Sequence, residues 1–351
     1  MTQFEEKKYV AEIPRNITCI LGVDIGGTNS NFGIFQARDG RPILLLSLHV
    51  KSKKIKEFPP VVNDLLSFVK QAYGITISHA LFAAAGVVSP DKDYSKPTNL
   101  PIIIDAAEIK KATELTCVYV VNDFEVIGYG LDLIAPKDLV LVNKGVARER
   151  ANKAILGAGT GLGKCIMIWE QDRDQYIPIA SEGGHEDFAV QNGLELELVE
   201  FIKHREKRPC NISWEDVLSG QGIQRIYQFF HARSNDGRDA AREQVPHPDE
   251  IFNARNHDQH SRDTFELYTA LYARCAKNFA LDVLARGGVY IAGGIAANNL
   301  EMFKLPLFME EFVNCGKQAE LLREVPIWVI TDYNVSLYGA AAYLLIENMC
   351  D

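Results

Sequence analysis

The sequence predicts an α/β protein built from two units of similar architecture. Short apolar runs typical of buried strands alternate with segments of helical periodicity along the chain. A Gly-Thr turn stands between two of these strands at residues 27–28, and a second stands between two strands at residues 159–160. From each turn the chain continues in a comparable order, so we expect duplicated βββαβα units with a cleft between two lobes.

The first unit is expected to follow a polar stretch, residues 1–17, which lacks periodicity and which we interpret as a loosely held extension. Apolar runs bounded by Gly, Asn and Asp predict the strands of this unit. Pro59 and Pro60 favour the start of a helix, because proline is tolerated in a first helical turn. The expected order is strand, strand, strand, helix, strand, helix, strand over residues 18–24, 31–36, 43–50, 59–73, 80–85, 105–115 and 117–121.

The second unit is expected to begin again with a strand, a glycine-rich turn and a returning strand, over residues 154–156, 157–161 and 165–169. Further helices are predicted over 194–204, 214–230 and 264–284, strands over 289–292 and 326–330, and a closing helix over 336–349. We therefore predict a small lobe over residues 18–133, completed by the C-terminal helix at 334–351, and a large lobe over residues 134–333.

One segment of the large lobe has a distinct composition. Residues 234–263 are dense in Arg, Asp, His and Asn, which favours a solvated insertion. The alternative for this segment is a metal site, because imidazole is a common metal ligand and the segment carries His247, His257 and His260.

Composition excludes several classes of partner. The 351 residues correspond to roughly two domains at about 150 residues each. With 37 basic and 46 acidic residues the net charge is −9, which disfavours nucleic acids and anionic membranes as partners. No run reaches the roughly 20 apolar residues that a membrane-spanning helix needs. The seven cysteines form no Cys-x-x-Cys pair, which indicates a cytoplasmic protein with free thiols.

The first motif that carries chemistry is Asp24-Ile25-Gly26-Gly27-Thr28-Asn29, directly after a predicted strand. Two glycines allow positive φ and a close approach of the backbone to a ligand. Backbone N–H groups and the Thr28 hydroxyl can then hold phosphate oxygens, and Asp24 can hold Mg²⁺ through water. The alternative is a plain hairpin turn with a capping Asp. The predicted phosphate contacts are Gly26, Gly27, Thr28 and Asn29.

Two further glycine-rich motifs lie in the second unit. Residues 157–163 contain four glycines, and they fit neither the spacing nor the strand-to-helix context of a dinucleotide-binding loop. We interpret them as a second phosphate turn, with contacts from Gly157, Gly159, Thr160 and Gly161. In residues 287–295 small residues follow a buried strand. Gly293 and Gly294 leave room for a flat ligand such as adenine, the alternative being a tight packing turn.

Together the three motifs resemble the ATPase domain shared by sugar kinases, actin and the heat-shock ATPases, which is a two-lobed ribonuclease H-like fold. More narrowly, the chain from about Leu21 to Ala342 resembles the bacterial-type glucokinase family. The matching segments are Val121-Asn122-Asp123-Phe124, the 157–163 turn, Glu182-Gly183-Gly184-His185-Glu186-Asp187-Phe188-Ala189, Val217-Leu218-Ser219-Gly220 and Ile291-Ala292-Gly293-Gly294-Ile295.

The resemblance implies a role for each remaining site residue. Asp123 matches the catalytic base, with a helix N-cap as its alternative reading. The implied sugar ligands are Asn99, Asn122, Asp123, Glu182, His185 and Glu215. The alternative for Glu215 is a favourable charge near a helix N-terminus. The family has a tryptophan after its Thr-Asn pair, whereas Leu100 follows Asn99 in this chain, so the shape of the sugar loop departs from the family pattern.

The implied activity is phosphorylation of glucose to glucose 6-phosphate by ATP and Mg²⁺. The alternatives are a kinase for another hexose or an aminosugar, and a non-catalytic sugar-sensing regulator. The implied partners are glucose and ATP. A homodimer is one assembly compatible with the sequence.

Overall fold

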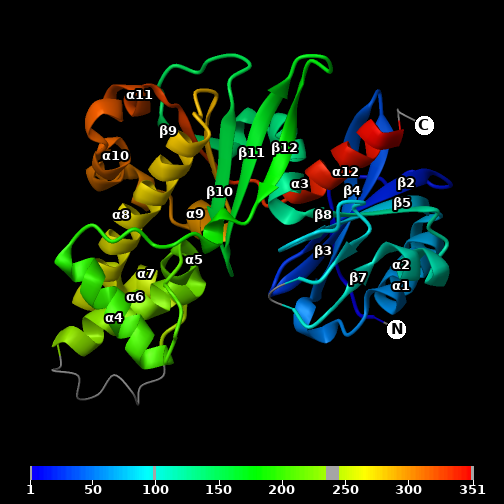
Figure 1. Cartoon of the computed structure of the whole chain (residues 1–351). Helices are drawn as coiled ribbons and strands as arrows, with labels where there is room; N and C mark the ends of the chain where they lie inside the picture. The colour runs from blue at the N-terminus through cyan, green and yellow to red at the C-terminus, as the bar shows by residue number, and fades with distance from the viewer. Residues whose placement is uncertain (1, 98–99, 235–244, 349–351) are drawn as a thin grey trace. The chain divides into compact units, whose positions relative to one another are not determined.

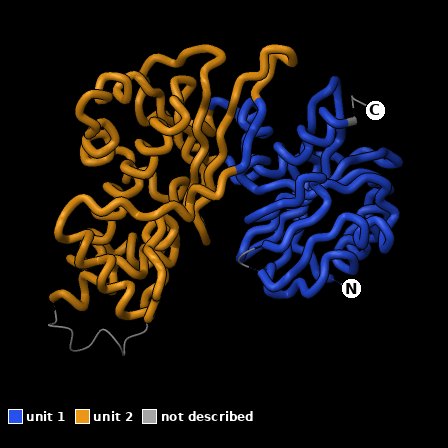
Figure 2. Tube along the Cα trace, in the orientation of Figure 1, with its two compact units in different colours: residues 1–136, 177–180, 332–351 blue, residues 137–176, 181–331 orange. Residues whose placement is uncertain are grey.

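The computed structural model describes residues 2–97, 100–234 and 245–348. The chain divides into two compact units (Figure 2). Unit 1 consists of residues 1–136, 177–180 and 332–351, and unit 2 consists of residues 137–176 and 181–331.

Unit 1 is organised around a six-stranded sheet with the order β1-β4-β3-β2-β5-β8. Three pairs of neighbouring strands are antiparallel: β1-β4, β4-β3 and β3-β2. The other two pairs, β2-β5 and β5-β8, are parallel. The bounds are β1 Glu5–Lys8, β2 Thr18–Ile25, β3 Asn29–Arg38, β4 Arg41–Lys51, β5 Thr76–Ala84 and β8 Cys117–Asn122. A separate two-stranded ladder joins β6 Tyr94–Ser95 to β7 Ile104–Asp105.

Helices cover both faces of this sheet (Figure 1). Helices α1 (Phe58–Tyr73) and α2 (Ala106–Ala112) share one apolar cluster with the sheet, and α3 (Asp123–Gly130) and α12 (Val335–Asn348) share another. Helices α3 and α12 approach closely because each has a glycine at the crossing. A Cβ on Gly339 would overlap the carbonyl oxygen of Val126, and a Cβ on Gly130 would overlap that of Val335.

A second six-stranded sheet has the order β12-β11-β10-β13-β14-β9; it belongs to unit 2 except for residues 177–180 of β12, which are counted with unit 1. Strand β10 pairs antiparallel with β11 and parallel with β13, and β13 pairs parallel with β14. The bounds are β9 Leu139–Asn143, β10 Lys153–Ala158, β11 Leu162–Glu170, β12 Gln175–Ser181, β13 Gly288–Ala292 and β14 Ile327–Ile330. The strands of each unit can be renumbered from β2 in the first sheet and from β10 in the second. Apart from the extra edge strands β1 and β9, both sheets then have the order 3-2-1-4-5, which confirms the predicted duplication.

A large helical layer packs on the sheet of unit 2. Its central element is α8, whose Tyr268, Leu271 and Tyr272 are fully buried in the main apolar cluster of the unit. The helices are α4 Gly193–Glu206, α5 Trp214–Val217, α6 Gly220–Ser234, α7 Pro248–Asn253, α8 Gln259–Asp282, α9 Gly294–Asn298, α10 Pro306–Val313 and α11 Ala319–Glu324. None of the helices in the described residues is long and apolar enough to span a bilayer.

A buried ionic cluster joins three helices of this layer. The guanidinium of Arg274 in α8 donates to both carboxylate oxygens of Glu195 in α4, at 2.8 and 2.9 Å, and to Glu311 in α10 at 3.2 Å. Glu195 is completely buried and also accepts from the Gln191 N–H and the Asn192 side chain. Its charge is therefore fully compensated inside the protein.

Three predictions about the fold are wrong, and the first concerns the N-terminus. Residues 1–17 are not simply a loose extension, because Glu5–Lys8 forms edge strand β1 against β4. The Tyr9 N–H donates to the Leu45 carbonyl at 2.9 Å, and its hydroxyl lies 3.2 Å from Asn334 Oδ1. All four residues of β1 are exposed, so backbone pairing rather than an apolar pattern holds the strand.

The second correction concerns residues 234–263. Residues 235–244 lie outside the described residues. Residues 245–263 are mostly exposed or half-buried, as expected of a solvated segment, but they form helices that their composition does not predict: α7, a short 3-10 helix and the start of α8. Ile251 and Phe252 are buried, and the Phe252 ring packs edge-on against Phe265 at 5.0 Å. His247 precedes α7, and no group of three His, Cys, Asp or Glu side chains able to hold a metal occurs in the described ranges.

The third correction is that residues 214–230 form two helices rather than one. The break falls at Leu218 and Ser219, between α5 and α6. There the Gly220 N–H donates to the Gly159 carbonyl at 2.9 Å, and the Ser219 hydroxyl accepts from the Gly222 N–H at 3.1 Å. A contact with the glycine-rich turn therefore interrupts the helix.

Candidate active site

In unit 1 the candidate residues lie at the carboxyl ends of parallel strands. Asp24 is the last residue but one of β2, Asn122 ends β8, and the end of β5 lies between them, since Asp24 pairs with Ala83 and Asn122 with Ala84. In open α/β sheets ligands bind at this edge. The arrangement brings the predicted metal residue and the predicted base to one edge of one sheet.

Asn122, rather than Asp123, is the N-cap of α3. Its side-chain oxygen accepts from the N–H groups of Phe124 and Glu125 at 2.9 and 3.1 Å, and its amide donates to the Gly86 carbonyl at 3.2 Å. Asp123 is the first residue of the helix, and its carboxylate also accepts from the Phe124 N–H at 3.0 Å. The N-cap reading of Asp123 is therefore wrong, and its carboxylate lies at the positive end of the helix dipole.

The turn after β2 is tight for a reason other than the one predicted. Neither Gly26 nor Gly27 has positive φ. Gly26 is required because a Cβ there would lie 2.9 Å from the Asn29 carbonyl oxygen. Buried Ser52 supports the turn, since its hydroxyl donates to the Gly26 carbonyl at 2.6 Å and its N–H donates to the Thr28 carbonyl at 3.0 Å. Thr28 and Asn29 remain exposed and available to a ligand.

In unit 2 the glycine-rich turn is hydrogen-bonded to the protein interior on one side and has free space on the other. The buried Tyr272 hydroxyl accepts from the Ala158 N–H at 3.2 Å, and the Gly159 N–H donates to the Gly161 carbonyl at 2.8 Å. A Cβ on Gly159 would meet nothing within 4 Å. The turn therefore leaves space on its outer side, as a phosphate-binding turn requires.

The third glycine motif lies next to this turn. Gly293 has φ +91°, and a Cβ there would lie 2.6 Å from the Ala158 carbonyl oxygen, so this position requires glycine on both counts. Gly294 begins α9, and a Cβ there would meet no atom within 4 Å. Both predicted nucleotide motifs of unit 2 thus lie at the carboxyl ends of the neighbouring strands β10 and β13.

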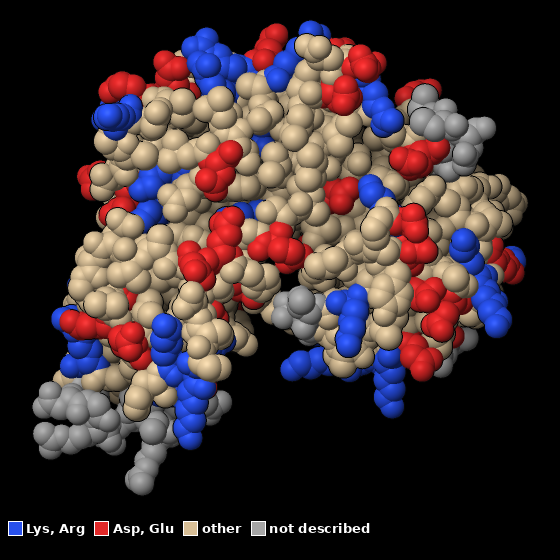
Figure 3. Space-filling model, in the orientation of Figure 1, with Lys and Arg blue, Asp and Glu red and all other residues tan. Residues whose placement is uncertain are grey.

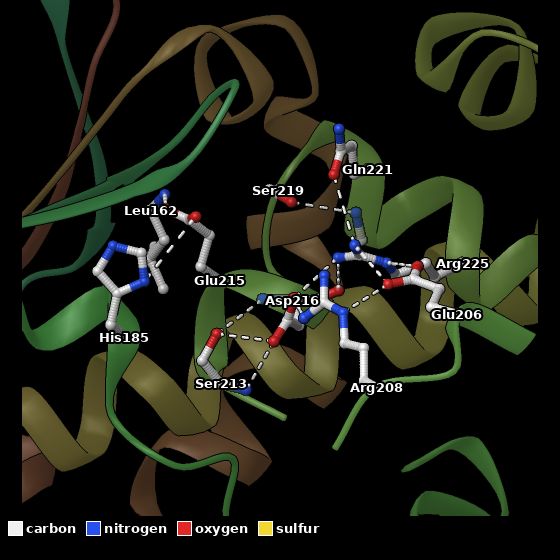
Figure 4. A network of polar contacts seen from close by, with 11 residues as sticks. Leu162, His185, Glu206, Arg208, Ser213, Glu215, Asp216, Ser219, Gln221 and Arg225 are labelled. Carbon is white, nitrogen blue, oxygen red and sulfur yellow. Dashed lines mark hydrogen bonds and ion pairs between the residues drawn. The ribbon is translucent and has the colours of Figure 1, made fainter. Parts of the chain in front are cut away.

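The three predicted sugar residues of unit 2 come together in space. His185 Nε2 lies 3.7 Å from Glu182 Oε2, and His185 Nδ1 lies 4.0 Å from Glu215 Oε1. The other oxygen of Glu215 accepts from the Leu162 N–H at 2.9 Å. Figure 4 shows Glu215 and His185 beside Leu162, the residue that follows the glycine-rich turn. Two carboxylates and an imidazole, all partly exposed, thus converge.

Gly183 and Gly184 allow the backbone between Glu182 and His185 to approach β11 closely. A Cβ on Gly184 would overlap the Leu162 carbonyl oxygen, and a Cβ on Gly183 would lie 2.9 Å from Lys164 Cδ. Lys164 is buried, and its ammonium donates to Glu186 Oε2 at 2.7 Å. Residues 183–185 therefore pack as a short 3-10 turn directly on β11.

Sequence reasoning missed the residues that support the site, among them Lys164, Ser52 and Ser336. Ser336 donates its hydroxyl proton to Asp24 Oδ2 at 2.9 Å. Burial raises the pKa of Asp24, and hydrogen bonds from Ser336 and Asn31 oppose that shift. Of the three supporting residues, only Lys164 has a feature visible in the sequence, because it is a lysine in an otherwise apolar strand. The predicted sugar ligand Asn99 lies outside the described residues.

Charged side chains of both signs are interspersed over the face of the described residues drawn in Figure 3. The glycine turns supply N–H groups on a background of net negative charge. Binding of an anion would therefore depend on local donors rather than on a broad positive field.

The two sheets share the order 3-2-1-4-5 over five strands, and each has a glycine turn after strand 1, which is β2 in one sheet and β10 in the other. These features define the actin-like ATPase fold of sugar kinases. The comparisons agree. The glucokinase family model matches residues 21–347. The glucokinase of Nostoc punctiforme is 34% identical over 344 residues, covering 93% of this chain and 98% of that protein.

Solved structures show the same relationship. A glucokinase from an Antarctic psychrotroph has a TM-score of 0.75 at 26% identity and covers 93% of this chain and 98% of its own. The glucokinase of Balamuthia mandrillaris, solved in complex with glucose, has a TM-score of 0.77 at 22% identity and covers 94% of each chain. The chain belongs to the glucokinase family, and it is therefore an ATP-dependent hexose kinase that phosphorylates glucose.

Proposed function

We propose that Asp123 is the general base of this reaction and that Glu182, His185 and Glu215 bind the sugar hydroxyls. The carboxylate of Asp123 accepts the proton of the attacking hydroxyl as the γ-phosphoryl group transfers. A base of this kind contributes about 10²–10⁴-fold. Positioning and neutralisation of phosphate charge supply the rest of the acceleration.

The observation that carries the sugar assignment is the Glu182–His185–Glu215 group. Two carboxylates, each within 4.0 Å of the same imidazole, offer several acceptors and a donor on partly exposed side chains. A polyhydroxylated ring can satisfy such a group. Asn122 is a weaker candidate ligand, because both ends of its side-chain amide already bond to backbone groups.

The nucleotide is proposed to contact the turn at Gly26, Gly27, Thr28 and Asn29, the turn at Gly157, Gly159, Thr160 and Gly161, and the glycines Gly293 and Gly294. The open space at Gly159 and Gly294 supports this assignment. Exposed Thr28 and Thr160 add hydroxyl donors.

Magnesium fits this site as a partner of the nucleotide. Asp24 places one carboxylate at the turn, and no three-ligand group for a metal occurs among the described residues. One carboxylate suits Mg²⁺ held mainly by phosphates and water. When bound, the ion would neutralise phosphate charge, and Asp24 would be the residue that holds it, through water.

Glu182→Gln is expected to raise the sugar KM about 10- to 100-fold, since the loss of a charged hydrogen bond weakens binding by that order. The KM for ATP should change less than about twofold, because that substitution removes no phosphate contact. Steady-state kinetics with each substrate varied separately measures both values. Glu197→Gln is the matched control, as Glu197 is about equally exposed and paired with Arg233. Equal rises in both KM values for Glu182→Gln would contradict the assignment.

The substrate preference is tested by a coupled assay with ATP across a panel of hexoses and aminosugars. Glucose is expected to give the highest kcat/KM of the panel. A higher kcat/KM with mannose, fructose or N-acetylglucosamine would show that this sugar, rather than glucose, is the preferred substrate. Absence of turnover with every sugar, together with sugar binding, would indicate a regulator.

We also propose a cytoplasmic location and a homodimer. The free thiols of the described cysteines support the first, because such thiols persist in a reducing compartment. Light scattering on the purified chain tests the second.

A further inference from the structure

A second polar network lies next to Glu215, on the side away from His185 and Leu162 (Figure 4). None of its side chains is among the proposed catalytic or substrate-binding residues. The carboxylate of Asp216 accepts from Arg208 Nη1 at 2.5 Å and from Arg225 Nη1 at 3.1 Å. Both guanidinium groups also contact Glu206, each through its Nε at 2.6 Å. Two carboxylates and two guanidiniums therefore alternate in one cluster, which we call the Asp216 anchor.

The second oxygen of Asp216 is bonded as well. It accepts from the Ser213 N–H at 2.9 Å and from the Ser213 hydroxyl at 3.0 Å, which completes a capping box at the start of α5. Arg225 Nη1 also donates to the Asp216 carbonyl at 2.9 Å. Burial opposes ionisation of Asp216, but the bonds from Ser213 and Arg208 outweigh it and lower its pKa.

Helix α5 needs such an anchor because it has only four residues. A single helical turn is unfavourable by itself, since nucleation fixes several dihedral angles for one hydrogen bond. The other fixed points are the buried side chains of Trp214 and Val217, the Trp214 backbone N–H, which donates to the Glu186 carbonyl at 2.9 Å, and the Gly220 contact with Gly159. The direction of every side chain on α5 therefore depends on these few contacts.

Glu215 precedes Asp216 and points the opposite way, toward Leu162 and His185 (Figure 4). Its side chain is 28% exposed, whereas that of Asp216 is 11% exposed. A rotation of α5 that releases Asp216 would also move Glu215 away from the Leu162 N–H. The position of Glu215 beside His185 therefore depends on the Asp216 anchor, because Glu215 and Asp216 belong to the same single turn of helix.

We propose that Asp216, held by Arg208 and Arg225, is a positioning residue that aims Glu215 at the sugar and so determines sugar affinity. The inference rests on the proposed function, in which Glu215 is a sugar ligand. It assigns a substrate-binding task to four charged residues, Glu206, Arg208, Asp216 and Arg225, that touch no substrate themselves.

The principal test is Asp216→Asn, which keeps the shape of the side chain but removes its charge. The sugar KM is expected to rise about tenfold, because two charge-assisted bonds weaken. The KM for ATP should change less than about twofold. Arg225→Met, which removes the neighbouring guanidinium, should give the same split, and it serves as the second variant if Asp216→Asn folds poorly.

A double-mutant cycle separates positioning from direct binding. If Asp216 acts only through Glu215, then Glu215→Gln combined with Asp216→Asn should raise the sugar KM no more than Glu215→Gln alone. Full multiplication of the two effects would overturn the inference.

Asp258→Asn is the matched control for loss of stability. Asp258 caps α8, its carboxylate accepts from the Ser261 N–H at 2.7 Å, and its pKa is lowered by bonds to Ser261 against the effect of burial. This variant should lower the melting temperature without a change in the sugar KM. An equal rise in the sugar KM for Asp258→Asn would overturn the inference.

The remaining outcomes distinguish the inference from the proposed function. A normal sugar KM for Glu215→Gln would overturn both, because Glu215 would then not be a sugar ligand. A raised KM for Glu215→Gln with a normal KM for Asp216→Asn and Arg225→Met would overturn the inference alone.

Discussion

Asp123→Asn is expected to lower kcat about 10²–10⁴-fold and to leave the dissociation constant for glucose within about threefold of its original value. The amide keeps the shape of the side chain but cannot accept the proton of the attacking hydroxyl. The fold should survive, because Asn122 rather than Asp123 caps α3. A coupled assay measures kcat, and calorimetry measures glucose binding.

Asp105→Asn is the control for this variant. Asp105 stands at the N-terminus of α2 in the same unit, and its carboxylate accepts from the N–H groups of Ala107 and Glu108. The substitution should leave kcat unchanged. If Asp123→Asn retained more than about a tenth of the original kcat, the general-base role would be wrong.

Arg274→Met is expected to lower the free energy of unfolding of unit 2 by about 3–5 kcal/mol, because it leaves the buried carboxylate of Glu195 without its cation. Denaturant titration followed by circular dichroism measures the change. Arg233→Met is the control, since Arg233 pairs with Glu197 at 3.2 Å with both side chains more than half exposed. Removal of such a surface pair should cost about 0–1 kcal/mol.

A double variant shows whether the cost comes from the unpaired charge. Arg274→Met combined with Glu195→Gln should be less destabilised than Arg274→Met alone, because the completely buried side chain at position 195 is then neutral. An equal or larger loss in the double variant would show that packing, rather than charge, accounts for the effect.

The elements with strong apolar patterns could be predicted from the sequence. The apolar pattern predicts a strand over 154–156, and β10 runs over Lys153–Ala158. It predicts a helix over 59–73, and α1 runs over Phe58–Tyr73. Buried faces impose a period on the chain that is visible without the structure. Strand β1 could not be found in this way, because its four residues are all exposed and show no alternation of apolar and polar side chains.

Local composition misled the prediction where a few contacts decide the structure. The polar segment around α7 is held by the burial of Ile251 and Phe252, two residues in a stretch dominated by charge. The periodic stretch 214–230 reads as one helix, yet the Gly220 bond to Gly159 divides it. In both places the partner is distant in sequence, so no local pattern shows the outcome.

The sequence by itself determined the duplicated α/β architecture, the three glycine motifs and the membership of Glu182, His185 and Glu215 in one candidate site. These follow from residue types and spacing, which carry both the strand pattern and the family resemblance. Only the tertiary structure decided which residue caps α3, since β8 extends to Asn122 by pairing with Ala84 of β5. It likewise brought Arg208 and Arg225 to Asp216 and Lys164 to Glu186. Such pairs form between side chains on separate elements, and their partners are set by how those elements pack.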